Sequence, residues 1–153
     1  MKIEQYQIEA KRTCPTLGSY DKDMTHMRLG IFTECGELLD AIKKNYAYGK
    51  PLDLVNVGEE IGDIAWYFVN EMTFKNVKAK IKPQRFKSPQ QIEEVITVIV
   101  ELQTLNCHFN LSQLINVANY FNLDFYELLD KNIAKLKARY PEKFTTENAL
   151  NRI

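Results

Sequence analysis

Glycine, proline and cysteine are all scarce in this sequence of 153 residues, which contains six, five and three of them. So few glycines and prolines leave long uninterrupted segments in which helices can form. The cysteines, Cys14, Cys35 and Cys107, are widely spaced and odd in number. They match neither a disulfide framework nor a paired zinc site.

An excess of charge of one sign is also missing, as is any long apolar run. Lys and Arg together number 20, as do Asp and Glu, which argues against a protein that binds the phosphate backbone of nucleic acids. The apolar runs, such as residues 95–100, are far shorter than a membrane span. The polar N-terminus lacks the apolar segment of a signal peptide. We therefore expect a cytoplasmic protein with no stable nucleic-acid or membrane partner.

The composition and the spacing of the apolar residues predict a single all-α domain over residues 1–153. Hydrophobic residues make up 45% of the chain and charged residues 26%, as in ordinary globular proteins. Gly49 and Pro51 separate two long predicted helices, and so short a connection makes these helices antiparallel neighbours. The first three helices are predicted over 3–12, from a cap at Asp21 or Asp23 to about Ala47, and from about Leu54 to Met72.

A basic segment opens the second half of the chain. Residues 75–87 contain six Lys or Arg and no acid, a pattern that predicts a solvated linker or a flap that attracts phosphate. Three more helices should follow, from a cap at Ser88 to about Asn106, over 111–121, and from a cap at Asp124 to about Tyr140.

Two pairs of acidic residues are the most informative feature of the sequence. Glu34 and Glu37 lie three residues apart in the second predicted helix, and Glu60 and Asp63 lie three apart in the third. This spacing puts each pair on one side of its helix. At roughly 100° per residue, each pair has one acid about 80° from the centre of the apolar stripe and one about 60° further round. Glu37 and Glu60 also lie at similar heights, roughly 12–15 Å from the turn.

We therefore expect the four carboxylates to converge beside the helix hairpin. Such a cluster repels itself and takes up protons unless a cation neutralises it. Oxygen ligands in this number suit Mg²⁺, or Mn²⁺ in its place. Two acids three residues apart also occur often by chance on helix surfaces, so each pair alone is a weak signal. Asp40, Glu59 and Glu71 lie near the two rows, and we interpret them as outer or solvated residues.

The last predicted helix carries the opposite charge. Lys131, Lys135 and Arg139 follow one another at four-residue steps, and Asn132 lies near the same edge of the apolar face. A cationic stripe beside a carboxylate–metal site is what a polyphosphate needs. A solvated basic face that merely balances the acids would have the same spacing.

Weaker candidates for substrate-binding residues lie on the first two long helices. His26 precedes Glu37 by three turns in roughly the same azimuth, which favours lining a pocket over binding a metal. Lys44 follows the acidic pair and could contact phosphates. Four aromatic side chains could stack on a base, although packing in a core or an interface is the commoner outcome for such aromatics; they are Tyr46, Tyr48, Trp66 and Tyr67.

These residues carry a resemblance to a known family. The segments TECGELLDAIKK and YGKPLDLVNVGEEIGDIAWY resemble the MazG-like nucleoside triphosphate pyrophosphohydrolases of the all-α NTP pyrophosphatase superfamily. The family signature, ExxE followed by ExxD, falls on the two acidic pairs. Further matches are YQIEAKRT, His26 with Gly30, and KNIAKLKARYPEKFTTENALNR. Together the matches cover residues 5–74 and 118–152.

The resemblance implies an antiparallel helix bundle that hydrolyses a nucleoside or deoxynucleoside triphosphate between the α and β phosphates, giving monophosphate and pyrophosphate. The four acids would bind Mg²⁺, and Glu37 would orient or deprotonate the attacking water. The resemblance also implies a homodimer or homotetramer with pockets between subunits. Residues 75–117 are an insert relative to shorter members, which could cover the site, alter the oligomer or replace a partner's helix. The phosphates would be held by Lys131, Asn132, Lys135 and Arg139.

A neighbouring enzymatic option is a dUTPase- or phosphoribosyl-ATP-type pyrophosphohydrolase, which would share the metal site but differ in the base pocket. The alternative from another class is a non-catalytic helical module that senses nucleotide or binds a protein partner. It predicts nucleotide binding that survives Glu37→Gln, and no turnover by the parent protein. Four carboxylates are costly to hold together without a cation, which favours the enzyme.

Overall fold

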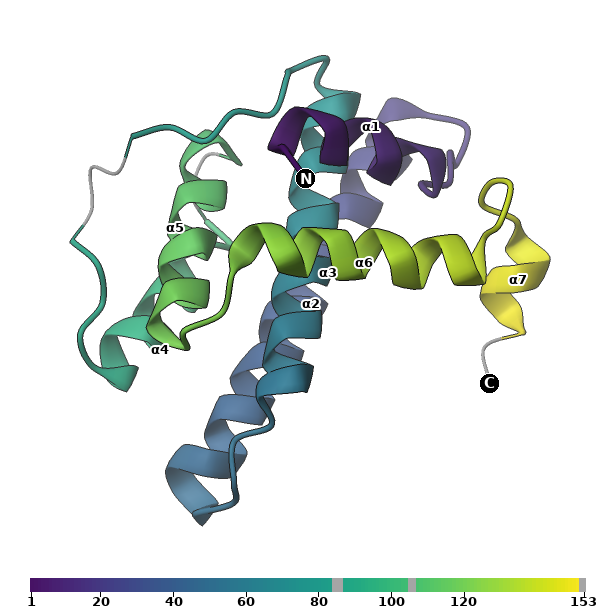
Figure 1. Cartoon of the computed structure of the whole chain (residues 1–153). Coiled ribbons are helices and arrows are strands. Elements are labelled where there is room, and N and C mark those ends of the chain that lie inside the picture. Colours follow the sequence, from purple (N-terminus) through teal and green to yellow (C-terminus); the bar gives the residue numbers. More distant parts are fainter. Residues whose placement is uncertain (84–86, 105–106, 152–153) are drawn as a thin grey trace.

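Two long helices run antiparallel through the centre of the structure (Figure 1). The computed structural model describes residues 1–83, 87–104 and 107–151. The central pair consists of α2 (Tyr20–Tyr48) and α3 (Leu54–Phe74), which pack along their length. Side chains at three- and four-residue steps fill the seam between them. The fully or almost fully buried ones include Met27, Ile31, Leu38, Ile42, Ile61, Ile64 and Phe68.

Shorter helices surround this pair. α1 (Ile3–Arg12) and α6 (Phe125–Arg139) pack against α3 and against each other, and α6 crosses α3 steeply in Figure 1. α4 (Ile92–Glu101) contacts α2, and α5 (Cys107–Tyr120) contacts α3 and α4. The short α7 (Thr146–Leu150) follows the end of α6. Every regular element in the described ranges is a helix and none is a strand, which confirms the all-α prediction.

No helix among the described residues is long and apolar enough to cross a membrane.

The start of α2 differs from the prediction. Ser19 caps the helix, because its side chain accepts a hydrogen bond from the Lys22 backbone N–H at 3.3 Å. Asp23, one of the two predicted caps, is buried inside the first turn and accepts instead from the Leu17 backbone N–H at 2.7 Å. The prediction of Asp21 or Asp23 as the cap was therefore wrong, since the carboxylate serves the preceding loop. At the other end Gly49, with φ of 65°, closes α2 as predicted.

The boundaries of α4 also differ from the prediction. The helix begins at Ile92 rather than at Ser88 and ends at Glu101, and the predicted end at Asn106 lies outside the described residues. The Glu94 carboxylate accepts a hydrogen bond from the Gln90 backbone N–H at 2.6 Å. A capping interaction therefore exists, but it joins these two residues rather than Ser88 and Gln91, because the helix begins later than predicted. In contrast, the predicted cap at Asp124 is confirmed, because its side chain accepts from two backbone N–H groups of the first turn of α6.

The basic segment that follows α3 is fixed to α1. The Gln7 side chain donates to the Val77 carbonyl at 2.8 Å and accepts from the Ala79 backbone N–H at 2.8 Å. Ala79 is fully buried. Residues 77–83 form no helix, which confirms the linker prediction for this part of the segment. The linker is not simply solvated, however, because its backbone is hydrogen-bonded to Gln7. Arg85 lies outside the described residues.

The crossing of α6 over α3 is close because two glycines of α3 face α6. A Cβ atom at Gly58 would lie 2.8 Å from Leu128 Cδ2, and one at Gly62 would lie 3.2 Å from Asn132 Cβ. A side chain at Gly58 would displace the end of the Leu128 side chain, and one at Gly62 would press on Asn132. The glycines thus let the polar residues of α6 approach the acidic part of α3.

We expect Gly30→Ala and Gly36→Ala, both on α2, to have opposite effects on stability. A methyl group at Gly30 would lie 2.0 Å from the Tyr67 ring, so the first substitution should lower the free energy of unfolding by about 1–3 kcal/mol. Gly36 has nothing within 4 Å, so the second should raise it by about 0.5–1 kcal/mol. Urea unfolding of the metal-free protein, followed by circular dichroism, measures both. Equal shifts of the same sign would contradict the packing of Tyr67 on α2.

Candidate active site

Three carboxylates from the two central helices face one another partway along the hairpin. Glu34 and Glu37 of α2 and Glu60 of α3 place carboxylate oxygens within 4.8 Å of one another. Glu34 is half-buried, Glu37 is exposed and Glu60 is only 7% exposed. The structure thus brings together three of the four acids in the two sequence pairs. We call these three residues the acid cluster.

Burial and mutual repulsion make the acid cluster take up protons. Burial, followed by a hydrogen bond with Glu34 and the charges of the neighbouring acids, raises the pKa of Glu60 to about 8. Burial, followed by the charge of Asp63, also raises the pKa of Glu34. In addition, Glu60 Oε2 is buried and has no hydrogen-bond partner within the described part of the chain. A buried oxygen without a partner is costly, so a cation bound here would stabilise the cluster.

The donor set of the acid cluster fits a hard divalent cation. All three ligands are carboxylates, without the thiolates or imidazoles that zinc favours. Mg²⁺ and Mn²⁺ both prefer such oxygen donors. The unpaired Glu60 Oε2 offers a lone pair that no group in the described ranges uses.

The fourth acid, Asp63, bonds to α6 instead. Its Oδ1 accepts from Asn132 Nδ2 at 2.6 Å and from Lys135 Nζ at 2.9 Å, and its Oδ2 accepts from Lys135 Nζ at 2.7 Å. Asn132 Oδ1 accepts in turn from the Tyr6 hydroxyl at 2.8 Å. This chain of bonds fixes Asp63 beside the acid cluster, where its charge acts on the pKa of Glu34.

Tyr6 is a site residue that the sequence reasoning missed. It is fully buried on α1, and its hydroxyl reaches both Asn132 Oδ1 and the Gly62 carbonyl. Burial, with a contribution from Asp63, raises the Tyr6 pKa well above its usual value, so the hydroxyl remains a donor. The sequence feature that could have identified Tyr6 is its place as the first residue of YQIEAKRT, one of the segments that carry the family resemblance. A tyrosine on an apolar helix face otherwise looks like ordinary core.

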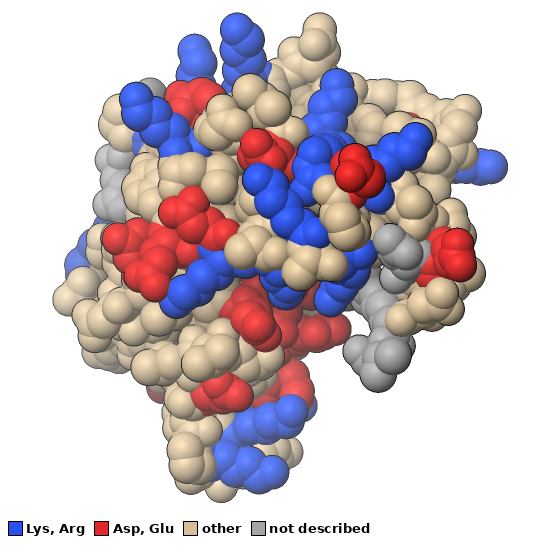
Figure 2. Space-filling view, turned by 45° about the vertical axis from the view of Figure 1, so that its right-hand side comes forward, with Lys and Arg blue, Asp and Glu red and all other residues tan. Residues whose placement is uncertain are grey.

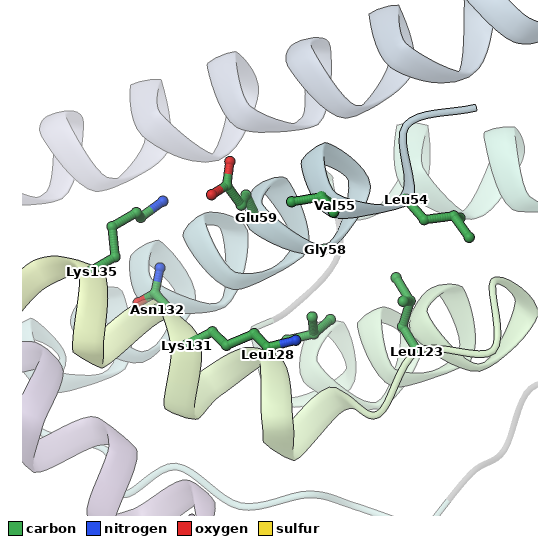
Figure 3. Close-up of a pocket in the computed structure, with 9 residues that line it drawn as sticks. All are labelled: Leu54, Val55, Gly58, Glu59, Leu123, Leu128, Lys131, Asn132 and Lys135. Atoms are coloured by element: carbon green, nitrogen blue, oxygen red, sulfur yellow. The ribbon is translucent and has the colours of Figure 1, made fainter. Parts of the chain in front are cut away.

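A cavity of about 400 Å³ opens between α3 and α6 beside Lys135 (Figure 3). Leu54 and Leu123 lie at one end of this cavity, and Glu59 and Lys135 lie at the other. Lys131 lies along its rim and pairs with Glu127 at 2.7 Å. We call it the lysine cavity. It is lined by Leu54, Val55, Gly58, Glu59, Leu123, Leu128, Lys131, Asn132 and Lys135.

A second cavity, of about 390 Å³, lies further along α3. Aromatic side chains from α3 and from the end of the chain form much of its wall, and Asp63 lies at its edge. We call it the aromatic cavity. No described residue of the insert 75–117 lines either cavity. The aromatic cavity is lined by Thr13, Pro15, Thr16, Leu17, His26, Asp63, Trp66, Tyr67, Leu136, Arg139, Tyr140, Phe144, Thr146 and Ala149.

His26 lines the aromatic cavity, as predicted for a pocket residue. Its ring meets the Tyr67 ring edge-on at 6.0 Å. Burial lowers the His26 pKa, and the charge of Asp23 opposes this shift. Nδ1 is buried without a hydrogen-bond partner within the residues described.

The remaining candidates lie elsewhere. Lys44 pairs with Asp40 at 2.7 Å towards the end of the hairpin and lines neither cavity. Hydrogen bonds from Lys43 and Lys44 lower the Asp40 pKa to about 2, so this acid is already neutralised. Glu71 is buried and pairs with Lys75, away from the acid cluster.

Cys35 follows Glu34 in the chain but is not a reactive residue of the site. It is fully buried, as predicted for a small core residue. Burial, together with the charge of Glu34, raises its pKa to about 12. A thiol held protonated in the core is not a nucleophile.

The surface around the site carries charges of both signs. On the face shown in Figure 2, acidic side chains gather below a band of Lys and Arg side chains. Further acidic side chains lie beside and above this band, and further basic ones lie below the acids, so both signs of charge are present on this face. An anionic ligand that carries its own cation would meet both signs here.

Comparison of the chain with protein-family models, with curated proteins and with solved structures finds no match.

We expect the metal-free protein to lose stability as the pH rises from about 5 to 8. The pKa of Glu60 is about 8 in the folded state against 4.5 ordinarily. The stabilisation that this group contributes is therefore fully present below about 4.5 and lost as the pH rises through 8. Thermal unfolding in EDTA across this range measures the effect. Glu60→Gln should reduce the dependence of the unfolding temperature on pH, whereas Glu59→Gln, at an exposed neighbouring carboxylate, should leave this dependence unchanged. Equal pH dependence in the parent protein and both variants would refute the assignment of the effect to Glu60.

Proposed function

We propose that this protein is a metal-dependent nucleoside triphosphate pyrophosphohydrolase of the MazG-like type. It would hydrolyse a nucleoside or deoxynucleoside triphosphate between the α and β phosphates. The observation that carries the proposal is the acid cluster with its buried, unpaired Glu60 oxygen, next to Asp63 and Lys135. The ExxE and ExxD motifs of the resemblance fall on these same residues.

Glu34, Glu37 and Glu60 would hold Mg²⁺, or Mn²⁺ in its place. When bound, the metal lowers the pKa of a water molecule and offsets negative charge on the phosphates. Asp63, which falls on the ExxD motif, is a further candidate ligand, and among the described residues Asn132 and Lys135 hold its carboxylate. Transfer of Lys135 from Asp63 to a phosphate oxygen would free this carboxylate without creating an unpaired charge.

Glu37 is the residue best placed to act on the attacking water. It is the exposed member of the acid cluster, so water reaches it, whereas Glu60 is closed off from solvent. The water oxygen forms the new bond to phosphorus, the bridging P–O bond breaks, and Glu37 orients the water or takes its proton. The products are a nucleoside monophosphate and pyrophosphate.

The basic residues of α6 divide into two groups. Lys131 and Lys135 line the lysine cavity, and Arg139 lines the aromatic cavity, so all three could contact phosphates. Asn132 is 4% exposed, with its two polar atoms bonded to Tyr6 and Asp63. It would therefore position Asp63 rather than bind substrate.

The aromatic cavity is the place we assign to the nucleoside. Trp66 and Tyr67 form part of its wall and meet edge-to-face at 4.9 Å. Flat aromatic surfaces favour a planar base, and His26 adds a polar atom for its edge. Asp63 lines the same cavity, so a nucleoside there would have its phosphates near the acid cluster.

A homodimer or homotetramer belongs to this proposal. Leu29 and Phe32 are 60% and 54% exposed on α2, and they are one turn apart on one face. A second copy would cover these apolar side chains. Sedimentation analysis of the protein decides the oligomeric state.

Activity should appear as paired release of pyrophosphate and monophosphate from a nucleotide panel, with Mg²⁺ and not with EDTA. Glu37→Gln should lower the turnover rate by about a hundredfold to ten-thousandfold and leave nucleotide binding intact. Asp40→Asn, which removes a carboxylate of α2 that pairs with Lys43 and Lys44 and lines neither cavity, is the matched control. Orthophosphate and diphosphate would show cleavage at another bond and contradict the mechanism. Nucleotide binding without any product would favour the non-catalytic sensing module.

Binding of Mg²⁺ should raise the thermal stability of the protein and release protons. The cation competes with the proton that the raised Glu60 pKa retains, so its affinity should increase as the pH rises towards 8. Calorimetry in buffers of different ionisation enthalpy counts the released protons. Glu60→Gln should abolish the effect, and Asp40→Asn should not, because Asp40 is paired with two lysines. Equal loss in both variants would exclude a specific site.

A further inference from the structure

The segment after α6 forms one wall of the aromatic cavity. Tyr140, Phe144, Thr146 and Ala149 all line it, and the rings of Tyr140 and Phe144 pack at 5.3 Å. Another part of its wall comes from α3, through Asp63, Trp66 and Tyr67. This C-terminal segment, residues 140–149, therefore helps to decide the width of the cavity.

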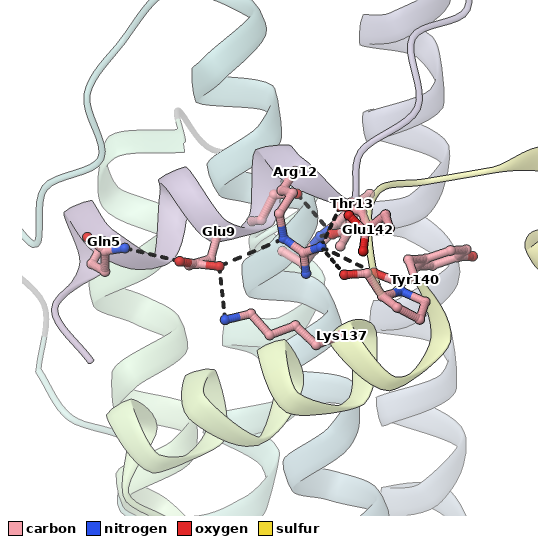
Figure 4. Close-up of polar contacts among 10 residues, drawn as sticks. Gln5, Glu9, Arg12, Thr13, Lys137, Tyr140 and Glu142 are labelled. Atoms are coloured by element: carbon pink, nitrogen blue, oxygen red, sulfur yellow. Dashed lines mark hydrogen bonds and ion pairs between the residues drawn. The ribbon is translucent and has the colours of Figure 1, made fainter.

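Arg12 of α1 holds the beginning of this segment (Figure 4). Its Nη1 donates to three successive backbone carbonyls, those of Tyr140 at 3.2 Å, Pro141 at 3.2 Å and Glu142 at 2.9 Å. These carbonyls lie just beyond the end of α6, where backbone acceptors have no helical partner. One guanidinium thus fixes the direction in which the chain leaves α6.

The rest of the last turn of α1 serves the same cavity. Thr13 accepts a hydrogen bond from the Trp66 indole N–H at 3.1 Å and so orients that ring. Glu9 pairs with Lys137 of α6 at 3.2 Å, which adds a second tie between the two helices. The end of α1 therefore contacts both walls, one through Thr13 and the other through Arg12.

We propose that residues 140–149 are the specificity-determining wall of a nucleoside pocket and that Arg12 positions this wall. The inference rests on the proposed function, because it takes the aromatic cavity as the place of the nucleoside. Arg12 itself lines neither cavity, so it acts through the backbone that it holds. The acid cluster lies on α2 and α3 and makes no use of these contacts.

The test compares two ligands that differ in whether they carry a nucleoside. Inorganic tripolyphosphate with Mg²⁺ probes the phosphate and metal part of the site alone. The α,β-imido analogues of the four common deoxynucleoside triphosphates, also with Mg²⁺, probe the same part together with the aromatic cavity. Calorimetry of the full chain gives a dissociation constant for each ligand.

Four variants separate the positioning function from general stability. Arg12→Ala removes the tie, and Phe144→Ala alters the wall directly while leaving Arg12 in place. Arg12→Lys keeps a charged donor but loses the guanidinium fork. Lys11→Ala removes a neighbouring, exposed positive charge of α1 and is the matched control.

Arg12→Ala and Phe144→Ala should each raise the dissociation constant of the tightest-binding nucleotide analogue about tenfold. A loss of this size corresponds to about one charge-assisted hydrogen bond or its equivalent in packing. Binding of tripolyphosphate should stay unchanged in both. Arg12→Lys should recover part of the loss, and Lys11→Ala should bind like the parent.

The inference would be overturned if Arg12→Ala and Phe144→Ala weakened the binding of tripolyphosphate and of the nucleotide analogues equally, or weakened the binding of neither. So would a parent protein that binds tripolyphosphate as tightly as every nucleotide analogue, since the cavity would then not receive a nucleoside. In both cases the metal-dependent part of the proposed function stands. If the parent binds neither kind of ligand, the proposed function fails together with the inference.

Discussion

The close crossing of α6 over α3 is the constraint on which the candidate active site depends. Gly58 and Gly62 leave room for α6, so Asn132 and Lys135 reach Asp63. A buried tyrosine of α1 completes the bonds of Asn132. The same crossing separates two cavities, one with lysines at its rim and one with aromatic walls. The lysine cavity and the aromatic cavity therefore lie on the two sides of this crossing.

Electrostatic cost explains why this crossing lies beside the acid cluster. Glu60 is almost fully buried and next to two other carboxylates, an arrangement that is unfavourable for three negative charges. The raised pKa of Glu60 shows that a proton relieves part of the cost in the metal-free chain. At Asp63 the ammonium group of Lys135 neutralises the carboxylate instead. A divalent cation and a phosphate chain would replace the proton and the lysine while keeping the charges paired.

Local patterns predicted the parts of the fold that depend on residues near one another in the chain. The apolar period predicted α2 and α3, and the matched heights of Glu37 and Glu60 predicted that they would meet. The cap of α6 at Asp124 followed from its own spacing. The cap of α2 did not, because Asp23 bonds to a loop residue that the helix pattern does not include.

The sequence by itself determined an all-helical chain with an antiparallel hairpin and with Glu37 and Glu60 at similar heights, since helix periodicity and the short connection at Gly49 are local properties. It predicted that four carboxylates converge, and three of them do. Only the tertiary structure decided that Asp63 bonds to α6 rather than to the cluster, and that Tyr6 and Arg12 support the site. Their partners lie 126 and 128–130 residues away. Such contacts depend on how helices that no short connection joins pack against one another in space, and residue spacing along the chain does not specify that packing.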